Sequence, residues 1–456
     1  MSGSRRRPPR RAAIAGAGTS GLVAALLLHQ LGWEVTVVEA HARPRTGTRA
    51  PTLWPPALHV LDLLGLGDKV PAEAQPVEAL KFRTESGDRT LELGAAGCVT
   101  LSQSRLEHLL EERARMLGIS IHRGVRVDGA HPSEDAGLRV TGSTTVGTYP
   151  DLAVDLLIGA DGYRSVVRAI IGADLAGPIR GTQFALRDFV DETGRFDRTA
   201  VWTCTGGPGA LVTVPLPNNT IRLVAPYPLE QVVDESDFLS TRTVGHGFPP
   251  PEGPVVWEAE FIAHTQQATR FAQGQIALIG DAAHVQSPAG GRGMNQGIED
   301  AYTLVSELGA DPSGDVAEAV ARYAAIREQE MSDELAVNTA VTSHWNGTSA
   351  ADLLSPVVRS ELEVASCTFR RIAGSAAMAP DDASPLGRRV SLGAKAWPST
   401  SSLHVRAGLI DATTPARATI GARPGLVGSD LALPDGRYTL SPTMNILALE
   451  TQQAPA

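Results

Sequence analysis

Three glycines near the start of the chain have the spacing of a loop that binds a dinucleotide. They are Gly16, Gly18 and Gly21, in the segment GAGTSG. The first permits a tight turn, the second lets a pyrophosphate approach the backbone, and the third allows a helix to pack closely on a strand. Glu39, 18 residues after Gly21, is placed to accept hydrogen bonds from ribose hydroxyls. These residues predict a site for an adenosine diphosphate group.

A second set of residues with chemical potential lies between residues 280 and 295. Asp281 directly follows a short apolar strand, Ile276–Ile279, and a glycine-rich loop, Pro288–Gly293, leads to a helix expected to begin at Met294. An acid at a strand end can accept strong hydrogen bonds from ligand hydroxyls in a partly dry site. The start of the helix would favour negative charge on a nearby ligand. The alternative for Asp281 is an ordinary helix cap.

The elements that must position the first glycines follow from the hydrophobic pattern. Ala12–Ala15 is a short apolar strand, Leu22–Leu31 is an apolar helix, and Val35–Val38 is a strand rich in β-branched residues. This order places the positive end of the helix at the expected phosphates. The segment therefore predicts a βαβ nucleotide-binding unit.

Further along the chain the pattern changes. Leu152–Gly159 is a buried-type strand that runs into Ala160-Asp161-Gly162. Between residues 182 and 261, short alternating runs separated by Pro and Asn predict an antiparallel sheet. Beyond about Trp345 the periodicity fades into segments rich in Ser, Ala and Pro.

One amphipathic helix is expected at Arg105–Leu117. Ser104 and Glu107 have the spacing of a capping box that would open it. Arg105 lies in its first turn, away from the apolar stripe, and on its own would be interpreted as a solvated arginine.

Composition excludes several classes of protein. A net charge of -10 argues against non-specific nucleic-acid binding, and no apolar run reaches the length of a membrane span. The arginines before residue 12 are interpreted as a disordered tail rather than an export signal. Cys98, Cys204 and Cys367 lack the spacing of a metal site, so no metal is expected, and they fit buried thiols in a reducing cytoplasm.

Three motifs stand in a specific order: GAGTSG at Gly16–Gly21, ADG at Ala160–Gly162, and GDAAH at Gly280–His284. In this order and spacing the chain resembles the para-hydroxybenzoate hydroxylase family, the class A, single-component FAD-dependent monooxygenases. The resemblance covers roughly residues 12–345.

The resemblance implies non-covalent FAD and a set of residues that contact it. Arg49, Arg105 and Val127 match positions on adjoining elements, and Asp161 with Gly162 matches a motif also implicated in binding the nicotinamide cofactor. The full set comprises Gly16, Gly18, Thr19, Ser20, Gly21, Glu39, Ala40, Arg49, Arg105, Val127, Asp161, Gly162, Gly280, Asp281, Pro288, Gly291, Gly293, Met294 and Asn295.

The activity implied by the resemblance is hydroxylation of an aromatic or polyketide-like small molecule, as in natural-product tailoring. NADPH or NADH would be a transient co-substrate and O₂ the oxidant, acting through a C4a-hydroperoxyflavin. Baeyer–Villiger oxygenation or epoxidation on the same scaffold stays open as an alternative. A flavin-dependent halogenase is disfavoured because its W-x-W-x-I-P element is absent. A non-catalytic flavin-binding protein is disfavoured because the loop at Pro288–Asn295 is intact.

The substrate is less well defined by the sequence. Trp202 and Tyr227 are candidate contacts within the antiparallel region, although each also fits an ordinary packing role. Arg292 stands where related sequences often have Gln, so it could add positive charge beside the flavin or point to solvent. No catalytic residue, such as a general base, can be named.

The expected fold class is α/β, with a Rossmann-like FAD-binding domain, an interleaved antiparallel β-sheet substrate domain and a C-terminal helical or irregular extension. The boundaries expected are a tail at 1–11, a discontinuous FAD-binding domain at 12–180 and 265–345, a substrate domain at 181–264 and the extension at 346–456. The protein is expected to be a cytoplasmic monomer or homodimer.

Overall fold

The computed structural model describes most of the first 345 residues and four short strands beyond them. The described ranges are 9–44, 50–85, 87–93, 98–133, 137–177, 182–227, 235–288, 291–310, 314–345, 401–406, 409–411, 436–440 and 447–450.

The first sheet has the order β20-β21-β12-β1-β2-β8. Its strands are β1 (Arg11–Ala15), β2 (Glu34–Glu39), β8 (Ser120–Arg123), β12 (Leu156–Gly159), β20 (Ala272–Gln273) and β21 (Ile276–Leu278). All pair in parallel except β20, which runs antiparallel to β21. The expected βαβ unit is present, because β1 and β2 are neighbours joined by a helix.

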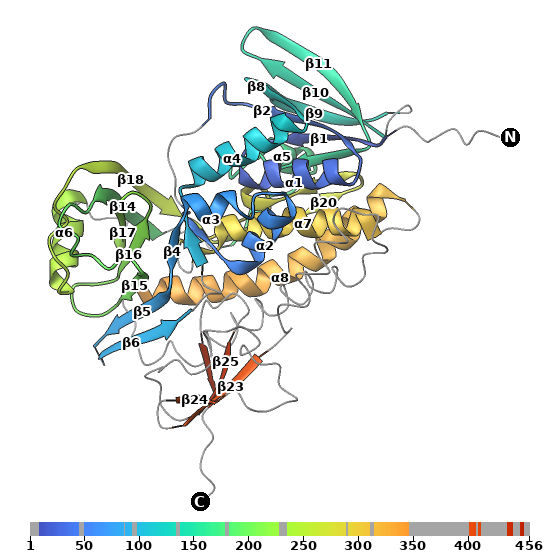
Figure 1. The fold of residues 1–456 in the computed structure, drawn as a ribbon. Coiled ribbons are helices and arrows are strands. Elements are labelled where there is room, and N and C mark those ends of the chain that lie inside the picture. Colours follow the sequence, from blue (N-terminus) through green and yellow to red (C-terminus); the bar gives the residue numbers. More distant parts are fainter. Residues whose placement is uncertain are drawn as a thin grey trace, which may run out of the picture.

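Four long helices pack with this sheet: α1 (Thr19–Gln30), α4 (Gln103–Met116), α7 (Gly293–Ala310) and α8 (Val316–Trp345). Helix α1 contacts both α4 and α7, and α7 contacts α8, as Figure 1 shows. Residues Gly21–Leu28 of α1 are all buried. A helix covered on every side is apolar all round, which explains why this segment lacks a polar face.

The second sheet is mainly antiparallel, with the order β18-β14-β17-β16-β15-β5-β6. Its strands are β5 (Ala79–Thr84), β6 (Gly87–Glu92), β14 (Thr182–Val190), β15 (Ala200–Cys204), β16 (Leu211–Leu216), β17 (Thr220–Tyr227) and β18 (Val255–Ala263). Helix α6 (Glu235–Gly245) packs on the outer side of the sheet, and the other side turns toward the first domain (Figure 1).

Two strands of this sheet come from outside the expected substrate domain. β5 pairs in parallel with β15, and β6 pairs with β5, so residues 79–92 extend the second sheet. The sequence boundaries had assigned these residues to the first domain. The correction arises because β5 lies next to β15 only in space, and local periodicity cannot report such a pairing.

Three smaller sheets connect or extend these layers. One contains β3 (Thr52–Leu53), β4 (Gln75–Val77) and β7 (Cys98–Thr100), and a second contains β13 (Leu175–Ala176), β19 (Gln266–Ala268) and β22 (His284–Val285). The third is a meander of β9 (Arg126–Ser133), β10 (Gly137–Thr144) and β11 (Gly147–Val154). Shorter helices are α2 (Pro55–Leu63), α3 (Lys69–Glu73) and α5 (Val166–Ile170).

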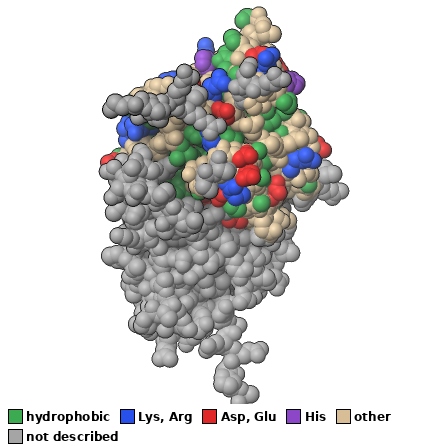
Figure 2. All heavy atoms as spheres, turned by 90° about the vertical axis from the view of Figure 1, so that its right-hand side faces the viewer, with side chains coloured by type: hydrophobic (Ala, Val, Ile, Leu, Met, Phe, Trp, Pro, Cys, Tyr) green, Lys and Arg blue, Asp and Glu red, His purple; other side chains and the backbone are tan. Residues whose placement is uncertain are grey.

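The described residues beyond 345 are strands that form one antiparallel sheet, in the order β24-β23-β25-β26. They are β23 (Ser401–Arg406), β24 (Leu409–Asp411), β25 (Gly436–Leu440) and β26 (Leu447–Glu450). Within the described part of the chain, no helix is both long and apolar enough to cross a membrane. Basic and acidic side chains are interspersed on the described part of the face in Figure 2.

Candidate cofactor and substrate site

The glycine turn between β1 and α1 is built by contacts that admit no side chain at two of its three glycines. Gly16 has a φ of +109°, and a β-carbon there would lie 2.2 Å from the carbonyl oxygen of Ala160. A β-carbon on Gly21 would lie 2.1 Å from the carbonyl oxygen of Gly16. At Gly18 the nearest atom would be Glu107 Oε1, at 3.6 Å. The turn therefore leaves an open approach at Gly18, as a pyrophosphate requires.

Glu39 lies at the end of β2, beside this turn. Its carboxylate accepts hydrogen bonds from the backbone N–H of Ala17 at 2.9 Å and of His41 at 2.8 Å. The backbone N–H of Val125 donates to its carbonyl oxygen at 3.0 Å. That contact brings the start of β9, with buried Val127, next to the Glu39–Ala40 corner. The structure thus brings together the residues expected around an adenosine group.

Helix α4 contributes residues to the turn that differ from the expected one. Glu107 Oε1 accepts from Thr19 N at 3.2 Å and from Gln103 Nε2 at 2.9 Å. Arg105 instead binds Glu73 of α3 with two hydrogen bonds, at 2.5 and 2.8 Å. The expectation for Arg105 is therefore not supported by its orientation, because Gln103 and Glu107 share one face of the helix and Arg105, two residues from each, points to the other side.

The start of α4 also differs from the expected capping box. Ser102 is the N-cap, and its side chain accepts a hydrogen bond from the backbone N–H of Arg105. Ser104 lies inside the helix, and Glu107 is occupied at the glycine turn rather than at the helix start. Arg105 is the third residue of the helix, so its hydrogen bond to Ser102 is the one that a capping box would make at this position. The acid that a capping box has at this third position is replaced here by an arginine.

Asp161 and Gly162 follow β12 and shape the next corner. The Asp161 carboxylate accepts from Ser165 Oγ at 2.5 Å and from the backbone N–H of Val166 at 2.7 Å, so it caps α5. Arg168 of α5 donates to the carbonyl oxygens of Ala282 and Tyr163, at 3.1 and 2.7 Å. This arginine ties the 160–163 corner to the segment that carries Asp281.

Asp281 lies in a 3-10 turn, Gly280–Ala282, directly after β21. Its side chain is exposed, whereas Gly280 and Ala282 are buried. The backbone N–H of Gly280 donates to Asp300 at 2.8 Å, which fixes the turn against α7. The carboxylate is therefore presented at the surface of a rigid corner.

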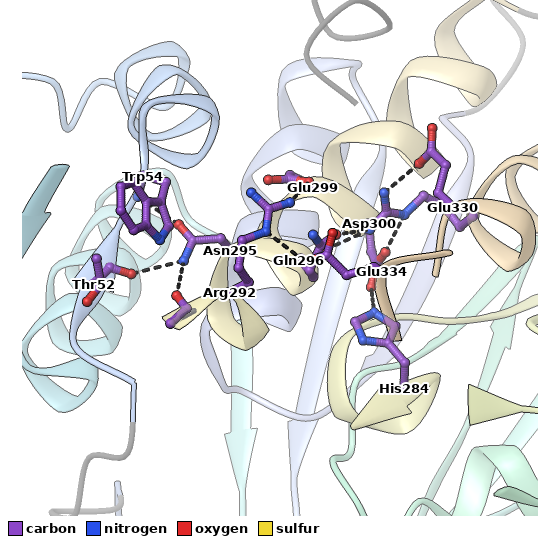
Figure 3. A network of polar contacts seen from close by, with 12 residues as sticks. Thr52, Trp54, His284, Arg292, Asn295, Gln296, Glu299, Asp300, Glu330 and Glu334 are labelled. Carbon is purple, nitrogen blue, oxygen red and sulfur yellow. Dashed lines mark hydrogen bonds and ion pairs between the residues drawn. The ribbon is translucent and has the colours of Figure 1, made fainter. Parts of the chain in front are cut away.

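The glycine-rich loop is held by Asn295, which is fully buried in the first turn of α7. Its side-chain amide donates to the carbonyl oxygens of Thr52 and Gly291, at 2.9 and 3.0 Å, and accepts from Trp54 N at 2.9 Å (Figure 3). Gly291 N donates to the Pro288 carbonyl at 3.0 Å. One amide thus joins strand β3, the loop and the start of α7.

Ala289, Gly290 and the candidate Arg49 lie outside the described residues.

Gly293 and Met294 begin α7 and complete this corner. Met294 is buried, and a β-carbon on Gly293 would come no closer than 3.9 Å to the Gln286 side chain. The start of an 18-residue helix therefore faces the loop, and its positive end favours a negatively charged ring.

A buried charge network lies behind this corner, between α7 and α8. Asp300 accepts from His284 Nε2 and Arg327 Nε, both at 2.6 Å. Figure 3 shows His284 beneath Asp300. Burial alone would raise the pKa of Asp300, but the charges of His284 and Arg327 outweigh it and hold the pKa at about 2. Arg327 also donates to Gln296 Oε1 at 2.6 Å. The GDAAH segment is thus anchored by charge-assisted bonds.

Arg292 belongs to the same layer and is 3% exposed, so the solvent-facing alternative for it is wrong. Its Nε donates to Glu334 Oε1 at 2.8 Å, and its Nη2 lies 3.8 Å from Glu299 Oε2. Burial, partly offset by Arg292 and Arg327 and reinforced by Glu334 and Glu330, raises the pKa of Glu299 to about 7. The sequence could not show that Glu334 of α8 pairs with this cation and that Glu299 of α7 lies beside it.

The two aromatic substrate candidates lie on the face of the second sheet that α6 covers. Tyr227 contacts Phe238 of α6, and Trp202 contacts Phe248, which follows α6. Their polar atoms bond within this face, Trp202 to Asp197 and Tyr227 to Glu260. The structure therefore does not place either side chain toward the first domain, because strand alternation turns both outward.

The opposite face of the sheet, which turns toward the first domain, was missed from the sequence. It carries an apolar and aromatic cluster: Phe184, Leu186, Ala210, Val212, Val224, Trp257, Phe261 and Ala263. Alternation along β14 was the available signal, since Phe184 and Leu186 share one face. At one end of the cluster, Arg222 and Asp188 form a buried ion pair.

These residues fit FAD in two respects. The Gly18 approach is open and is flanked by Glu39. Asp281 lies beyond the end of β21 in the same sheet, and its turn is bonded to α7, whose first turn carries the Asn295 corner. Among the described residues, no group of three or more His, Cys, Asp or Glu side chains is arranged to hold a metal ion.

The comparisons with known proteins agree with this geometry. A family model described as FAD binding domain matches residues 10–333. The chain is 32% identical over 313 residues to 6-methylpretetramide 4-monooxygenase of Streptomyces rimosus, covering 65% of this chain and 55% of the relative. It is 28% identical over 316 residues to rifampicin monooxygenase of Streptomyces venezuelae, covering 66% and 64%. The chain thus spans less than two thirds of the length of these relatives.

Solved structures show the same fold. p-Nitrophenol 4-monooxygenase of Pseudomonas putida matches with a TM-score of 0.67 and 22% identity, over 75% of this chain and 91% of that one. A complex of aklavinone-11 hydroxylase with FAD and aklavinone matches with a TM-score of 0.60 and 25% identity, over 73% and 68%.

Proposed function

Because the chain belongs to the FAD binding domain family, whose model matches residues 10–333, we propose that it is an FAD-dependent monooxygenase. The observation that carries the proposal is the corner held by Asn295, where the glycine-rich loop, β3 and the start of α7 meet. This corner lies in the first domain, on the side of the second sheet away from α6 (Figure 1). The face of the sheet on that side carries the apolar and aromatic cluster. Such an arrangement suits a ring held between a polar loop and an apolar wall.

The roles of the chain's own residues follow from their positions. Gly18 would admit the pyrophosphate, Glu39 would bind the adenosine ribose, and Asp281 would accept hydrogen bonds from the ribityl chain. Bound FAD supplies the redox chemistry by which NADPH or NADH and O₂ yield one transferred oxygen atom and water. The start of α7 would stabilise negative charge on the ring, and the buried face of the sheet would exclude water.

We propose an aromatic or polyketide-like substrate, modified during natural-product tailoring. The relatives named above act on 6-methylpretetramide and rifampicin, and the sheet face here offers Phe184, Trp257 and Phe261 for ring contacts. Hydroxylation is the favoured outcome. Baeyer–Villiger oxygenation or epoxidation would use the same site and is distinguished by the product.

Cysteine chemistry supports a cytoplasmic location. Cys98 and Cys204 are unpaired and buried. Burial raises the pKa of Cys204 to about 12 and raises that of Cys98 further, so both are inert thiols suited to a reducing compartment. We propose a monomer or homodimer there, with the domain division given above extended by β5 and β6.

The test is turnover by the FAD-loaded protein. NADPH and NADH oxidation should be stimulated by members of a panel of phenols, naphthols and hydroxyquinones, and ¹⁸O₂ should deliver one labelled atom to the product. The Gly18→Val variant, without FAD, is the matched control. Absence of both ligand-stimulated oxidation and label incorporation across the panel would overturn the proposal.

A further inference from the structure

The face of the second sheet that turns toward the first domain carries a paired arginine. Arg222 Nε and Nη2 donate to the two carboxylate oxygens of Asp188, at 2.7 and 2.8 Å. Arg222 is 1% exposed and Asp188 is 4% exposed. The guanidinium lies 5.5 Å from the centre of the Trp257 ring. The cation is therefore neutralised by a bidentate carboxylate and covered by an aromatic side chain.

The register places this pair at the end of the sheet nearest the proposed flavin corner. Arg222 pairs with Val214 across β17 and β16, and the next carbonyl, of Pro215, accepts a hydrogen bond from Thr100 Oγ1. Thr100 pairs with Thr52, whose carbonyl accepts from Asn295. A short chain of contacts thus joins the ion pair to the corner that would flank the ring.

The rest of this face is uncharged over four adjoining strands of the sheet. Within the described residues of β14, β16, β17 and β18, alternation assigns only Asp188 and Arg222 as charged side chains to it. The neighbours are the apolar and aromatic cluster of Phe184, Leu186, Val224, Trp257 and Phe261. A carboxylate placed against such a face would lose its hydration without gaining a cation.

Stability alone does not account for the pair, because a buried ion pair is often no more stabilising than apolar residues of similar size. We propose that Asp188 is a specificity-determining residue, which neutralises Arg222 so that the sheet face accepts uncharged aromatic ring systems and disfavours their carboxylates. The inference rests on the proposed function, since it assigns this face to the substrate. Asp188 acts through Arg222 and is thus a positioning residue.

A second ion pair on the same strands provides an internal control. Arg187 and Glu258 join β14 and β18, but on the face that α6 covers, one residue along from Asp188. Changing Glu258 releases a buried arginine, Arg187, on the face away from the first domain, although Glu258 itself is more exposed than Asp188. Its effect on a ligand between the sheet and the first domain should therefore be absent.

The experiment measures binding of 2-naphthoate and 2-naphthamide to the FAD-loaded protein through the flavin absorbance spectrum. The wild type should bind the amide more tightly. Asp188→Asn should shift the ratio of dissociation constants toward the carboxylate by roughly tenfold or more, because it leaves a cation with a neutral partner. Adding Arg222→Met should abolish the shift, and Glu258→Gln should not produce one.

Each other outcome overturns the inference. These are a wild type that prefers naphthoate, an unchanged ratio in Asp188→Asn, a shift that survives Arg222→Met, and an equal shift in Glu258→Gln. Should Asp188→Asn not fold, the apolar pair Asp188→Leu with Arg222→Met must keep the wild-type ratio, and a changed ratio contradicts the inference. Failure of the proposed function is distinguishable, because it abolishes turnover with every substrate but leaves these binding ratios measurable.

Discussion

Ser20 in α1 and Gly297 in α7 are in direct contact: a β-carbon built on Gly297 would lie 2.2 Å from Ser20 Oγ. Gly280, beside Asp281, meets the same hydroxyl, with a β-carbon position 2.6 Å away. Helix α1 follows the glycine turn and α7 follows the glycine-rich loop. This contact therefore sets the distance between the two parts of the cofactor site.

Replacing Gly297 with Ala should separate the two helices. The added methyl overpacks a closed contact and should destabilise the fold by about 1–3 kcal/mol, with a matching loss of FAD content. Ser20→Gly in the same chain should restore both. The control is Gly309→Ala in the same helix, where the nearest atom is a Leu31 methyl at 3.4 Å and the change should be neutral or stabilising. Urea unfolding and flavin absorbance measure the outcome, and equal effects at 297 and 309 would contradict the packing argument.

Gly18→Val should separate cofactor binding from folding. A β-carbon at position 18 meets only Glu107 Oε1 at 3.6 Å, so the protein should fold with a melting temperature close to that of the wild-type apoprotein. The valine would block the pyrophosphate, so the protein should be colourless. Gly16→Ala, by contrast, meets backbone at 2.2 Å and should not yield folded protein. A yellow Gly18→Val protein with stoichiometric FAD would refute the placement of the phosphates.

Glu299 should make stability depend on pH. Its pKa is raised from 4.5 to about 7, chiefly by burial. Between these values the folded state keeps a proton that the unfolded state has released, so stability falls as pH rises through the window and levels off above it. Glu299→Gln cannot titrate. It should equal the wild type near pH 4.5 and exceed it above pH 7, by up to about 3 kcal/mol.

The matched control for this titration is Glu334→Gln. Glu334 binds Arg292 directly, so its replacement should destabilise the protein where Glu299→Gln stabilises it. Urea unfolding at several pH values distinguishes the two. Parallel pH profiles for the wild type and Glu299→Gln would show that Glu299 does not hold the proton.

Gln103→Ala and Arg105→Ala should affect different properties of the protein, the first its affinity for FAD and the second its stability. Gln103 reaches the glycine turn through Glu107, so its loss should weaken FAD binding by roughly tenfold. Arg105 pairs with Glu73 in a half-exposed ion pair, so its loss should cost less than about 1 kcal/mol of stability and leave FAD affinity unchanged. Fluorescence titration of the apoproteins with FAD decides between them, and a larger effect at Arg105 would restore the assignment made from the sequence.

The sequence predicted the parts of the site that depend on backbone shape. Gly16 and Gly21 are required by contacts with backbone oxygens. Glu39 is the last residue of its strand and Asp281 follows one, and short apolar runs in the sequence indicate where both strands end. Such features recur with fixed spacing because the turn and the strand are local structures. The parallel sheet and the helix at Met294 followed from the same signals.

Side-chain direction and long-range pairing could not be predicted in this way. Arg105 was assigned to the cofactor because it matches a position that contacts FAD in the family, but the helix directs it to Glu73. Trp202 and Tyr227 were assigned to the substrate by residue type, although strand alternation turns both under α6 and its flank. The neutralisation of Arg292 by Glu334 depends on α8 packing on α7, which no local pattern encodes.

The order in which β12 acquires its neighbours constrains how the chain folds during synthesis. Leu157 pairs with Ile276, more than a hundred residues later, and the intervening chain first builds the second sheet. Until the ribosome has released β21, β12 exposes an open, apolar edge that can pair with another chain. Contacts so distant in sequence slow the final closure of the sheet. Recombinant yield should therefore depend on slow translation, low temperature and chaperone supply at the stage before residue 276 emerges.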